Sequence, residues 1–191
     1  YIIFSKIKSF ILPLKTNTNM TKKYLLIASI ITVIQSCNLT NHNELFTIYL
    51  VRHSEKELVS SDISDPKLTP CGKKRSESLS NFLKDIQLDA VYSTNYIRTR
   101  ETALPTALSK DLEIKYYNGN ELESFSDTLV NLKQNVLVVG HSNTTGVLAG
   151  LLTGKEIKPF DLNIYNRVYQ VVIFKKQTYL NLLHSAFECI D

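Results

Sequence analysis

The sequence LFTIYLVRHSE, residues 45–55, decides the fold prediction, because an apolar run ends directly in Arg52 and His53. A second apolar run, NVLVV at residues 135–139, ends in the same way just before His141. Near-continuous apolar runs of this length are typical of strands buried on both faces of a sheet. Ligands bind such sheets beyond the carboxyl ends of the strands, so we expect the two histidines at one binding edge.

Short apolar runs alternate with amphipathic stretches along the rest of the chain, which indicates an α/β layer fold. We expect a single three-layer α/β/α domain with a mostly parallel central sheet. Thr69 and Pro70 predict a helix start, because a hydroxyl N-cap precedes a proline at the first helical position. Pro105 is expected either to kink its helix or to begin a second segment. The expected strands are 45–51, 89–93, 114–117, 135–139, 168–174 and 179–187; the expected helices are 70–86, 99–109, 122–132 and 144–152; residues 57–67 form a loop.

The basic charge of the chain is confined to its N-terminal segment. The formal net charge is +4, but residues 1–36 hold five lysines and no acidic residue. Without that segment, 17 basic and 18 acidic residues remain, a net charge of −1. We therefore exclude nucleic acid as a partner, because nucleic-acid binding needs a basic surface on the folded domain.

Residues 20–37 have the organisation of a signal peptide. Lys22 and Lys23 form a basic region, residues 24–34 form an apolar run of 11 residues, and IQSC ends at Cys37. The run is shorter than the about 20 apolar residues that a spanning helix needs. The ending resembles the lipobox of bacterial lipoproteins, in which Cys37 would be lipidated and become the mature N-terminus.

These patterns predict the domain organisation and the location of the protein. We expect residues 1–36 to be an upstream extension followed by a lipoprotein signal peptide, residues 37–44 a tether, and residues 45–191 the folded domain. The expected location is extracytoplasmic, in the bacterial cell envelope, and the lipid on Cys37 is the only membrane contact that we predict. An uncleaved membrane anchor and a plain signal peptide stay open as alternatives.

The cysteines indicate no metal site. With Cys37 assigned to lipidation, Cys71 and Cys189 remain, 118 positions apart. No spacing of Cys and His residues resembles a metal site, and no cofactor is expected. Outside the cytoplasm the two cysteines could pair, but two lone cysteines so far apart are more often unpaired. Cys71 is interpreted as a structural residue in the first turn of its helix.

Two histidines and two arginines supply the chemistry that phosphoryl transfer requires. A neutral imidazole is a nucleophile near neutral pH, and attack of His53 on phosphorus would form a phosphoramidate that water can hydrolyse. Arg52 and Arg98 carry planar, permanently charged donors suited to phosphate oxygens. His141 adds a donor close to the amino end of the predicted 144–152 helix, which favours anions.

Each of these residues also has an ordinary structural explanation. A lone histidine at a strand end is commonly a hydrogen-bonded loop residue, and an isolated arginine is commonly half of a weak surface ion pair. The occurrence of all four at several predicted strand ends favours a catalytic site. A leaving alkoxide needs a proton, and Glu121, Glu123 and Glu55 are the candidate acids.

Four segments, in this order and spacing, resemble the histidine phosphatase superfamily: LVRH at 50–53, LTPCG at 68–72, YST at 92–94 with RTRETA at 98–103, and VGHSNT at 139–144. The resemblance runs from about residue 45 to residue 174. The first segment is most similar to that of small secreted or lipoprotein members with an Arg-His-Ala-Glu-Lys motif, and Ser54 stands where those members carry Gly or Ala.

The resemblance implies a phosphoglycerate mutase-like fold and a role for each matching residue. His53 would be the phosphorylated residue, with Arg52, Arg98 and His141 completing the phosphate pocket. Ser142 and Asn143 would add donors to the substrate. Glu121 falls where relatives carry an acid, although some compact members act without one.

The implied function is hydrolysis of a small phosphorylated substrate, a phosphomonoester or a phosphohistidine, without a metal ion. A phosphomutase is one alternative, but the 42 residues between Arg98 and His141 leave little room for the lid that a mutase needs. A catalytically weak lipoprotein that only binds a phosphorylated envelope component is the other. The physiological substrate and the oligomeric state stay open at this point.

Overall fold

Strands β1 (Leu45–Arg52) and β4 (Val136–Gly140) lie side by side in the centre of the sheet. They are parallel, and their register pairs Ile48 with Val136 and Arg52 with Gly140. Every residue of β4 and most of β1 are buried. The computed structural model describes residues 45–59, 64–158 and 161–189, and these apolar runs are strands covered on both faces, as predicted.

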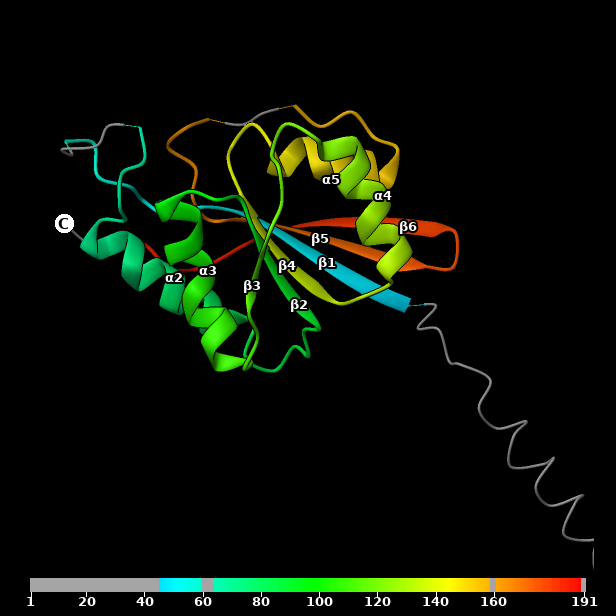
Figure 1. The fold of residues 1–191 in the computed structure, drawn as a ribbon, viewed down its shortest axis with the longest axis horizontal. Helices are drawn as coiled ribbons and strands as arrows, with labels where there is room; N and C mark the ends of the chain where they lie inside the picture. Colours follow the sequence, from blue (N-terminus) through cyan, green and yellow to red (C-terminus); the bar gives the residue numbers. More distant parts are fainter. Residues whose placement is uncertain (1–44, 60–63, 159–160, 190–191) are drawn as a thin grey trace, which may run out of the picture. The chain divides into compact units, whose positions relative to one another are not determined.

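The sheet has the order β3-β2-β4-β1-β5-β6 (Figure 1). The four neighbouring strands β3, β2, β4 and β1 are parallel; β5 pairs antiparallel with β1, and β6 pairs antiparallel with β5. The sheet is therefore mostly parallel, in agreement with the sequence prediction. The remaining strands are β2 (Ala90–Ser93), β3 (Ile114–Tyr116), β5 (Arg167–Phe174) and β6 (Gln177–His184).

Helices cover both faces of this sheet, which gives the predicted three layers (Figure 1). On one face, α2 (Pro70–Phe82) and α3 (Ile97–Ser109) enclose a core that includes Leu79, Leu83 and Ala103. On the other, α4 (Leu122–Leu132) and α5 (Thr145–Thr153) enclose a second core. Burial of these apolar residues is the main favourable contribution to folding.

Helix α2 begins as predicted but ends earlier. Thr69 is the N-cap, and its Oγ1 accepts a hydrogen bond from the backbone N of Gly72 at 2.9 Å. The helix ends at Phe82 rather than at Ile86, because Lys84 and Ile86 donate to carbonyls only three residues back. Leu83 and Ile86 still pack against the core. Periodicity alone therefore cannot distinguish the helix from the turn that continues its apolar face.

Helix α3 and strand β6 also depart from the prediction. Helix α3 runs unbroken through Pro105, so the alternative of a second segment was wrong. Packing of α3 against α2, β2 and β4 compensates for the backbone hydrogen bond that a proline cannot donate. Strand β6 begins at Gln177 rather than at residue 179, because Phe174 pairs with Gln177 across a two-residue turn. Lys175 adopts a left-handed backbone there, with φ 56°, as such tight hairpins require.

Residues 42–191 form one compact unit. The predicted signal peptide and the whole predicted tether, including the lipidation site Cys37, lie outside the described residues. Within the part that the structure describes, no helix has both the length and the apolar character needed to cross a membrane.

Candidate active site

The strand register brings the two histidines together. Because Arg52 pairs with Gly140 at the ends of β1 and β4, the next residues, His53 and His141, leave the sheet side by side. The backbone N of His53 donates to the carbonyl of Gly140 at 2.9 Å. The two imidazole rings lie 5.5 Å apart between centroids, in an edge-to-face arrangement. The predicted convergence at the carboxyl ends of the strands is thus present.

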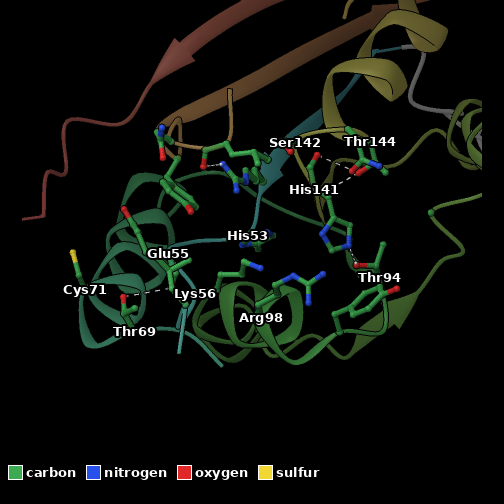
Figure 2. A pocket seen from close by; sticks show the side chains of 18 of the residues that line it. His53, Glu55, Lys56, Thr69, Cys71, Thr94, Arg98, His141, Ser142 and Thr144 are labelled. Atoms are coloured by element: carbon green, nitrogen blue, oxygen red, sulfur yellow. Dashed lines mark hydrogen bonds between the residues drawn. The ribbon is translucent and has the colours of Figure 1, made fainter. Parts of the chain in front are cut away.

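A cavity of about 1030 Å³ opens at this edge of the sheet (Figure 2). It is lined by the four residues expected to bind phosphate, Arg52, His53, Arg98 and His141, and by the two expected donors, Ser142 and Asn143. Segments on either side contribute part of the remaining wall: Leu58 after β1, Asn118–Asn120 after β3, and Leu162, Asn163 and Tyr165 before β5. The cavity is much larger than a phosphoryl group, so an organic portion of a substrate fits as well.

His53 is held as a neutral imidazole with a defined tautomer. Its Nδ1 lies 2.7 Å from the backbone carbonyl oxygen of Ser54, and a carbonyl only accepts, so Nδ1 carries the proton. The lone pair is therefore on Nε2. The pKa of His53 is lowered to about 3. Burial is the main cause, the hydrogen bond to Ser54 opposes it, and Arg52, His141 and Arg98 add to the decrease. At neutral pH Nε2 is available as a nucleophile.

His141 is oriented by a threonine that the sequence analysis did not single out. Oγ1 of Thr94 lies 2.9 Å from Nε2 of His141, and Thr94 itself donates to Thr99, whose hydroxyl donates to backbone carbonyls. Thr94 therefore accepts a hydrogen bond from Nε2–H of His141. This leaves Nδ1 of His141 as the ring nitrogen available to a ligand. Burial lowers the pKa of His141 to about 4, with contributions from Arg98, Arg52 and Lys56. A bound phosphate anion would raise that pKa and make Nδ1 a donor.

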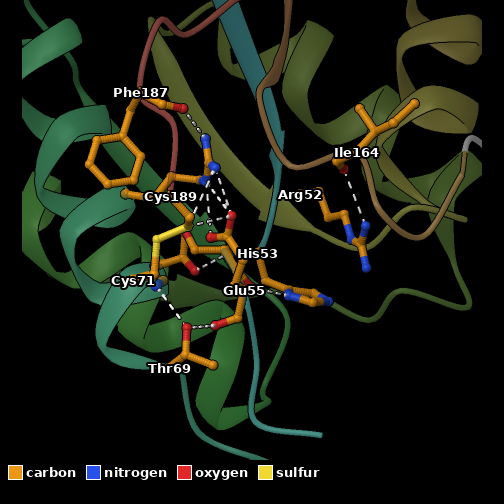
Figure 3. Close-up of polar contacts among 12 residues, drawn as sticks. Arg52, His53, Glu55, Thr69, Cys71, Ile164, Phe187 and Cys189 are labelled. Atoms are coloured by element: carbon orange, nitrogen blue, oxygen red, sulfur yellow. Dashed lines mark hydrogen bonds and ion pairs between the residues drawn. A yellow bond between two sulfur atoms is a disulfide. The ribbon is translucent and has the colours of Figure 1, made fainter. Parts of the chain in front are cut away.

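Arg52 is buried, and the segment before β5 holds it in place. Its NH1 donates to the carbonyls of Leu162 and Ile164 (Figure 3), and its guanidinium lies 4.1 Å from the ring centroid of Tyr165. Its Nε is buried and has no hydrogen-bond partner among the described residues. Burial lowers the pKa of Arg52, but arginine keeps its charge in proteins. A substrate oxygen would satisfy Nε.

Arg98 lies in the first turn of α3 and faces the same cavity (Figure 2). Its guanidinium carbon lies 4.4 Å from the ring centroid of Tyr96, and NH1 forms a 3.4 Å ion pair with Asp65. Asp65 also accepts from the backbone N of Ile97 at 2.7 Å, so it anchors the start of α3. These contacts fix the direction of Arg98 before a ligand binds, which is the preorganisation that electrostatic catalysis requires.

The candidate acids do not converge on the cavity as the four cationic and imidazole groups do. Glu121 and Glu123 are exposed at the start of α4 and do not line the cavity, and Oε1 of Glu121 accepts from Asn118 at 2.8 Å. Glu55 does line the cavity, but its carboxylate is bound by Arg75. Nε of Arg75 donates to Oε1 at 2.8 Å and to Oε2 at 2.9 Å, and NH2 of Arg75 lies 2.7 Å from Oε1. Among the described lining residues, Glu55 is the single carboxylate, and it is already paired.

Cys71 and Cys189 form a disulfide (Figure 3), so the pairing that the sequence left open does occur, although cysteines so far apart are more often unpaired. The tertiary fold brings the segment after β6 back to the start of α2, and the Cα atoms lie 5.8 Å apart despite a sequence separation of 118. Arg75 also donates to the carbonyl of Phe187 at 2.8 Å, which holds the same segment beside Glu55. Sequence spacing cannot reveal such a contact.

The disulfide also bears on metal binding. Among the described residues, ligand atoms of Glu55, Cys71 and Cys189 lie within 4.8 Å of one another. Because the two sulfur atoms are bonded to each other, they are not thiolates and cannot serve as the metal ligands that cysteines usually provide. This group is therefore a structural cluster.

The fold and the site define an α/β domain of the phosphoglycerate mutase-like class. Residues 48–119 match the model of the histidine phosphatase superfamily (branch 1). Phosphoserine phosphatase 1 of Hydrogenobacter thermophilus is 38% identical over 71 residues, 35% of this chain and 34% of that protein. The match thus spans about a third of the length of this curated relative. Over residues 48–119 the chain is thus similar to the histidine phosphatase superfamily (branch 1).

Solved structures with the same fold extend over most of the described domain. The protein histidine phosphatase SixA, solved in complex with tungstate, has a TM-score of 0.62 and 18% identity, covering 73% of this chain and 97% of that one. The alpha-ribazole phosphatase from Shigella flexneri has a TM-score of 0.62 and 16% identity, covering 76% and 100%. At these identities the similarity establishes the fold.

Proposed function

We propose that the protein is a phosphatase that hydrolyses phosphomonoesters or phosphohistidine through a phosphohistidine intermediate on His53. The observation that carries this proposal is the shared cavity of His53, His141, Arg52 and Arg98, in which His53 has a free Nε2 and Arg52 an unsatisfied Nε. The match of residues 48–119 to the superfamily model and the phosphatases among the similar proteins support it.

The reaction would proceed in two displacements. Nε2 of His53 attacks phosphorus, a P–N bond forms, and the P–O bond to the leaving group breaks with its electron pair on that oxygen. Water then attacks phosphorus, the P–N bond breaks, and inorganic phosphate leaves while the imidazole regains its lone pair. Arg52, Arg98 and His141 would bind the phosphoryl oxygens in both steps. The proposed chemistry needs no metal ion or cofactor.

Hydrolysis is favoured over phosphomutase activity by the short chain between the two halves of the site. Residues 99–140 form the rest of α3, the short strand β3, helix α4 and strand β4 with their connections, so no long segment is left to enclose an intermediate. A protein that only binds phosphate would not need the free Nε2 of His53. The disulfide also supports the proposed extracytoplasmic location, because disulfides persist in oxidising compartments. Lipidation of Cys37 stays part of this proposal.

The test is hydrolysis of p-nitrophenyl phosphate by the 191-residue chain and by His53→Ala. We expect the wild type to release p-nitrophenol and the variant to lose at least about a thousandfold in kcat/KM, because no other group replaces the nucleophile. Rapid quenching of the wild type with a labelled substrate should trap an acid-labile phosphoryl group on His53. Full activity in His53→Ala would exclude the mechanism.

A further inference from the structure

A second, basic cavity of about 640 Å³ lies at the end of the sheet where β1 begins, whereas His53 follows the other end of that strand. Its described lining comes from the start of β1, the residue after α4 and the turn between β5 and β6 (Figure 1). These lining residues are Phe46, Lys133, Phe174, Lys175, Lys176 and Gln177. No carboxylate is among the described lining residues, so three cations dominate the charge of this surface.

Exposed apolar side chains accompany the lysines. Leu45 pairs with Phe174 across β1 and β5, and directly opposite residues project from the same face of a sheet. Leu45 is 57% exposed and Phe174 is 42% exposed. The ammonium of Lys175 lies 5.3 Å from the ring centroid of Phe174, so cation and aromatic ring are neighbours. We call the three exposed lysines together with Leu45 and Phe174 the lysine face.

The chain enters the folded domain at the lysine face. Leu45 is the first residue of β1, and the seven residues 38–44 separate it from Cys37. The distance that the chain spans from Cys37 to Leu45 is at most about 28 Å when it is fully extended. Strand β1 has eight residues and is itself about 25 Å long. A lipid on Cys37, which is part of the proposed function, therefore holds this end of the domain closest to the membrane.

We propose that the lysine face docks on the anionic headgroups of a phospholipid membrane. Its three cations complement the negative charge of such a surface. Leu45 and Phe174 supply the apolar groups that enter the boundary between headgroups and acyl chains, which is how amphipathic surfaces gain affinity for a membrane. In this orientation β1 points away from the lipid, and the candidate active site lies about the length of that strand from the membrane. Soluble phosphorylated compounds reach it more readily than lipids of the same membrane.

Single-tryptophan variants test the contact, because the chain has no tryptophan of its own. Phe174→Trp places the fluorescent probe in the lysine face. Tyr116→Trp, at an exposed residue that ends the opposite edge strand β3, is the matched control. With the 191-residue chain on vesicles of equimolar phosphatidylcholine and phosphatidylglycerol, we expect the emission of Phe174→Trp to move to shorter wavelength and that of Tyr116→Trp to stay unchanged. On vesicles of phosphatidylcholine alone, neither emission should move.

The contribution of the lysines is measured in the Phe174→Trp background. The test variant replaces the lysines of the face: Lys133→Gln, Lys175→Gln and Lys176→Gln. The matched control removes the same charge from exposed lysines of α2 and the turn after it: Lys73→Gln, Lys74→Gln and Lys84→Gln. We expect the test variant to need at least about tenfold more anionic vesicles for the same shift, and the control to behave as the parent. Every variant keeps the lysines of residues 1–36, so the difference reports the lysine face.

Hydrolysis of p-nitrophenyl phosphate checks that the variants are folded, and it should stay at the parent level because none of the replaced residues lines the candidate active site. An unshifted Phe174→Trp, an equal shift in Tyr116→Trp, or a shift that survives loss of the three lysines would overturn the proposal. A parent chain that does not hydrolyse p-nitrophenyl phosphate, with the shift intact, would refute the phosphatase function and leave the docking face standing. A mature N-terminus other than a lipidated Cys37 would refute the lipidation alone.

Discussion

His53 combines two properties that a histidine nucleophile needs, a fixed tautomer and a neutral ring. The Ser54 carbonyl holds the proton on Nδ1, and burial together with the nearby arginines disfavours a second proton. The arginines proposed to bind the phosphoryl group would therefore also keep the proposed nucleophile, Nε2 of His53, unprotonated. A substrate dianion would partly offset those positive charges. Electrostatic repulsion between the positive groups is therefore greatest when the site is empty.

The pKa of His53 predicts an unusual acid limit for activity. Because this pKa is lowered to about 3, His53 stays neutral from pH 7 down to pH 5, and we expect kcat/KM for the substrate dianion to stay flat over that interval. Activity should fall only as the pH approaches the pKa of His53, about 3, because protonation of Nε2 removes the nucleophile. Steady-state assays of p-nitrophenyl phosphate, corrected for the ionisation of the substrate, measure this. A fall centred near pH 6.5, the ordinary histidine value, would contradict it.

Glu121 provides a second test at the scale of a residue. It is exposed, bonded to Asn118 and outside the cavity lining, so we expect Glu121→Gln to keep kcat/KM for alkyl phosphates within about threefold of the wild type. Loss of a working general acid typically costs about a hundredfold or more for a poor leaving group. A loss of that size, with p-nitrophenyl phosphate unaffected, would assign Glu121 as the acid. Asp127→Asn, an exposed carboxylate further along α4, is the control.

At the scale of elements, the site depends on how closely the segment after β1 approaches helix α2. The backbone N of Thr69 donates to the carbonyl of Glu55 at 2.9 Å, and a Cβ added to Gly72 would lie 2.2 Å from that same carbonyl oxygen. Only a glycine permits this contact. The LTPCG segment, part of the resemblance to the superfamily, therefore has a structural role. It holds in place the chain that carries His53 and Glu55.

Gly72→Ala should therefore destabilise the fold and displace the nucleophile. We expect the free energy of unfolding to fall by about 2–3 kcal/mol, because the contact is with backbone that cannot rotate away. Denaturant titration measures the change, and kcat/KM should fall in the folded variant. Gly119→Ala is the matched control for stability, since its added Cβ would meet its nearest neighbour at 3.4 Å. Equal stability of the two variants would refute the explanation.

At the scale of the whole molecule, the disulfide joins the segment after β6 to the start of α2, next to the site. It closes a loop of 118 residues, which in the chain-entropy account restricts the unfolded chain considerably. Arg75 links the two parts further, because it binds both Glu55 and the carbonyl of Phe187. The end of the described chain thus supports the residues that follow His53.

Removal of this disulfide should lower stability more than activity. For Cys71→Ala/Cys189→Ala we expect the free energy of unfolding to fall by about 2–4 kcal/mol, as measured by denaturant titration. Treatment of the wild type with a reductant should give a similar decrease and should leave the double variant unchanged. An unchanged wild type under reducing conditions would show that the disulfide contributes nothing to stability.

The sequence alone was enough to predict the main lines of the fold and the residues that gather at the candidate site. Apolar runs ending in Arg52-His53 and just before His141 predicted buried parallel strands whose carboxyl ends meet, because hydrophobic periodicity and strand direction are local properties. Only the tertiary structure decided that Cys71 meets Cys189, that Glu55 turns away to Arg75 and that Lys56 and Tyr165 face the cavity. These outcomes depend on contacts between distant segments and on the direction of single side chains, which no local pattern encodes.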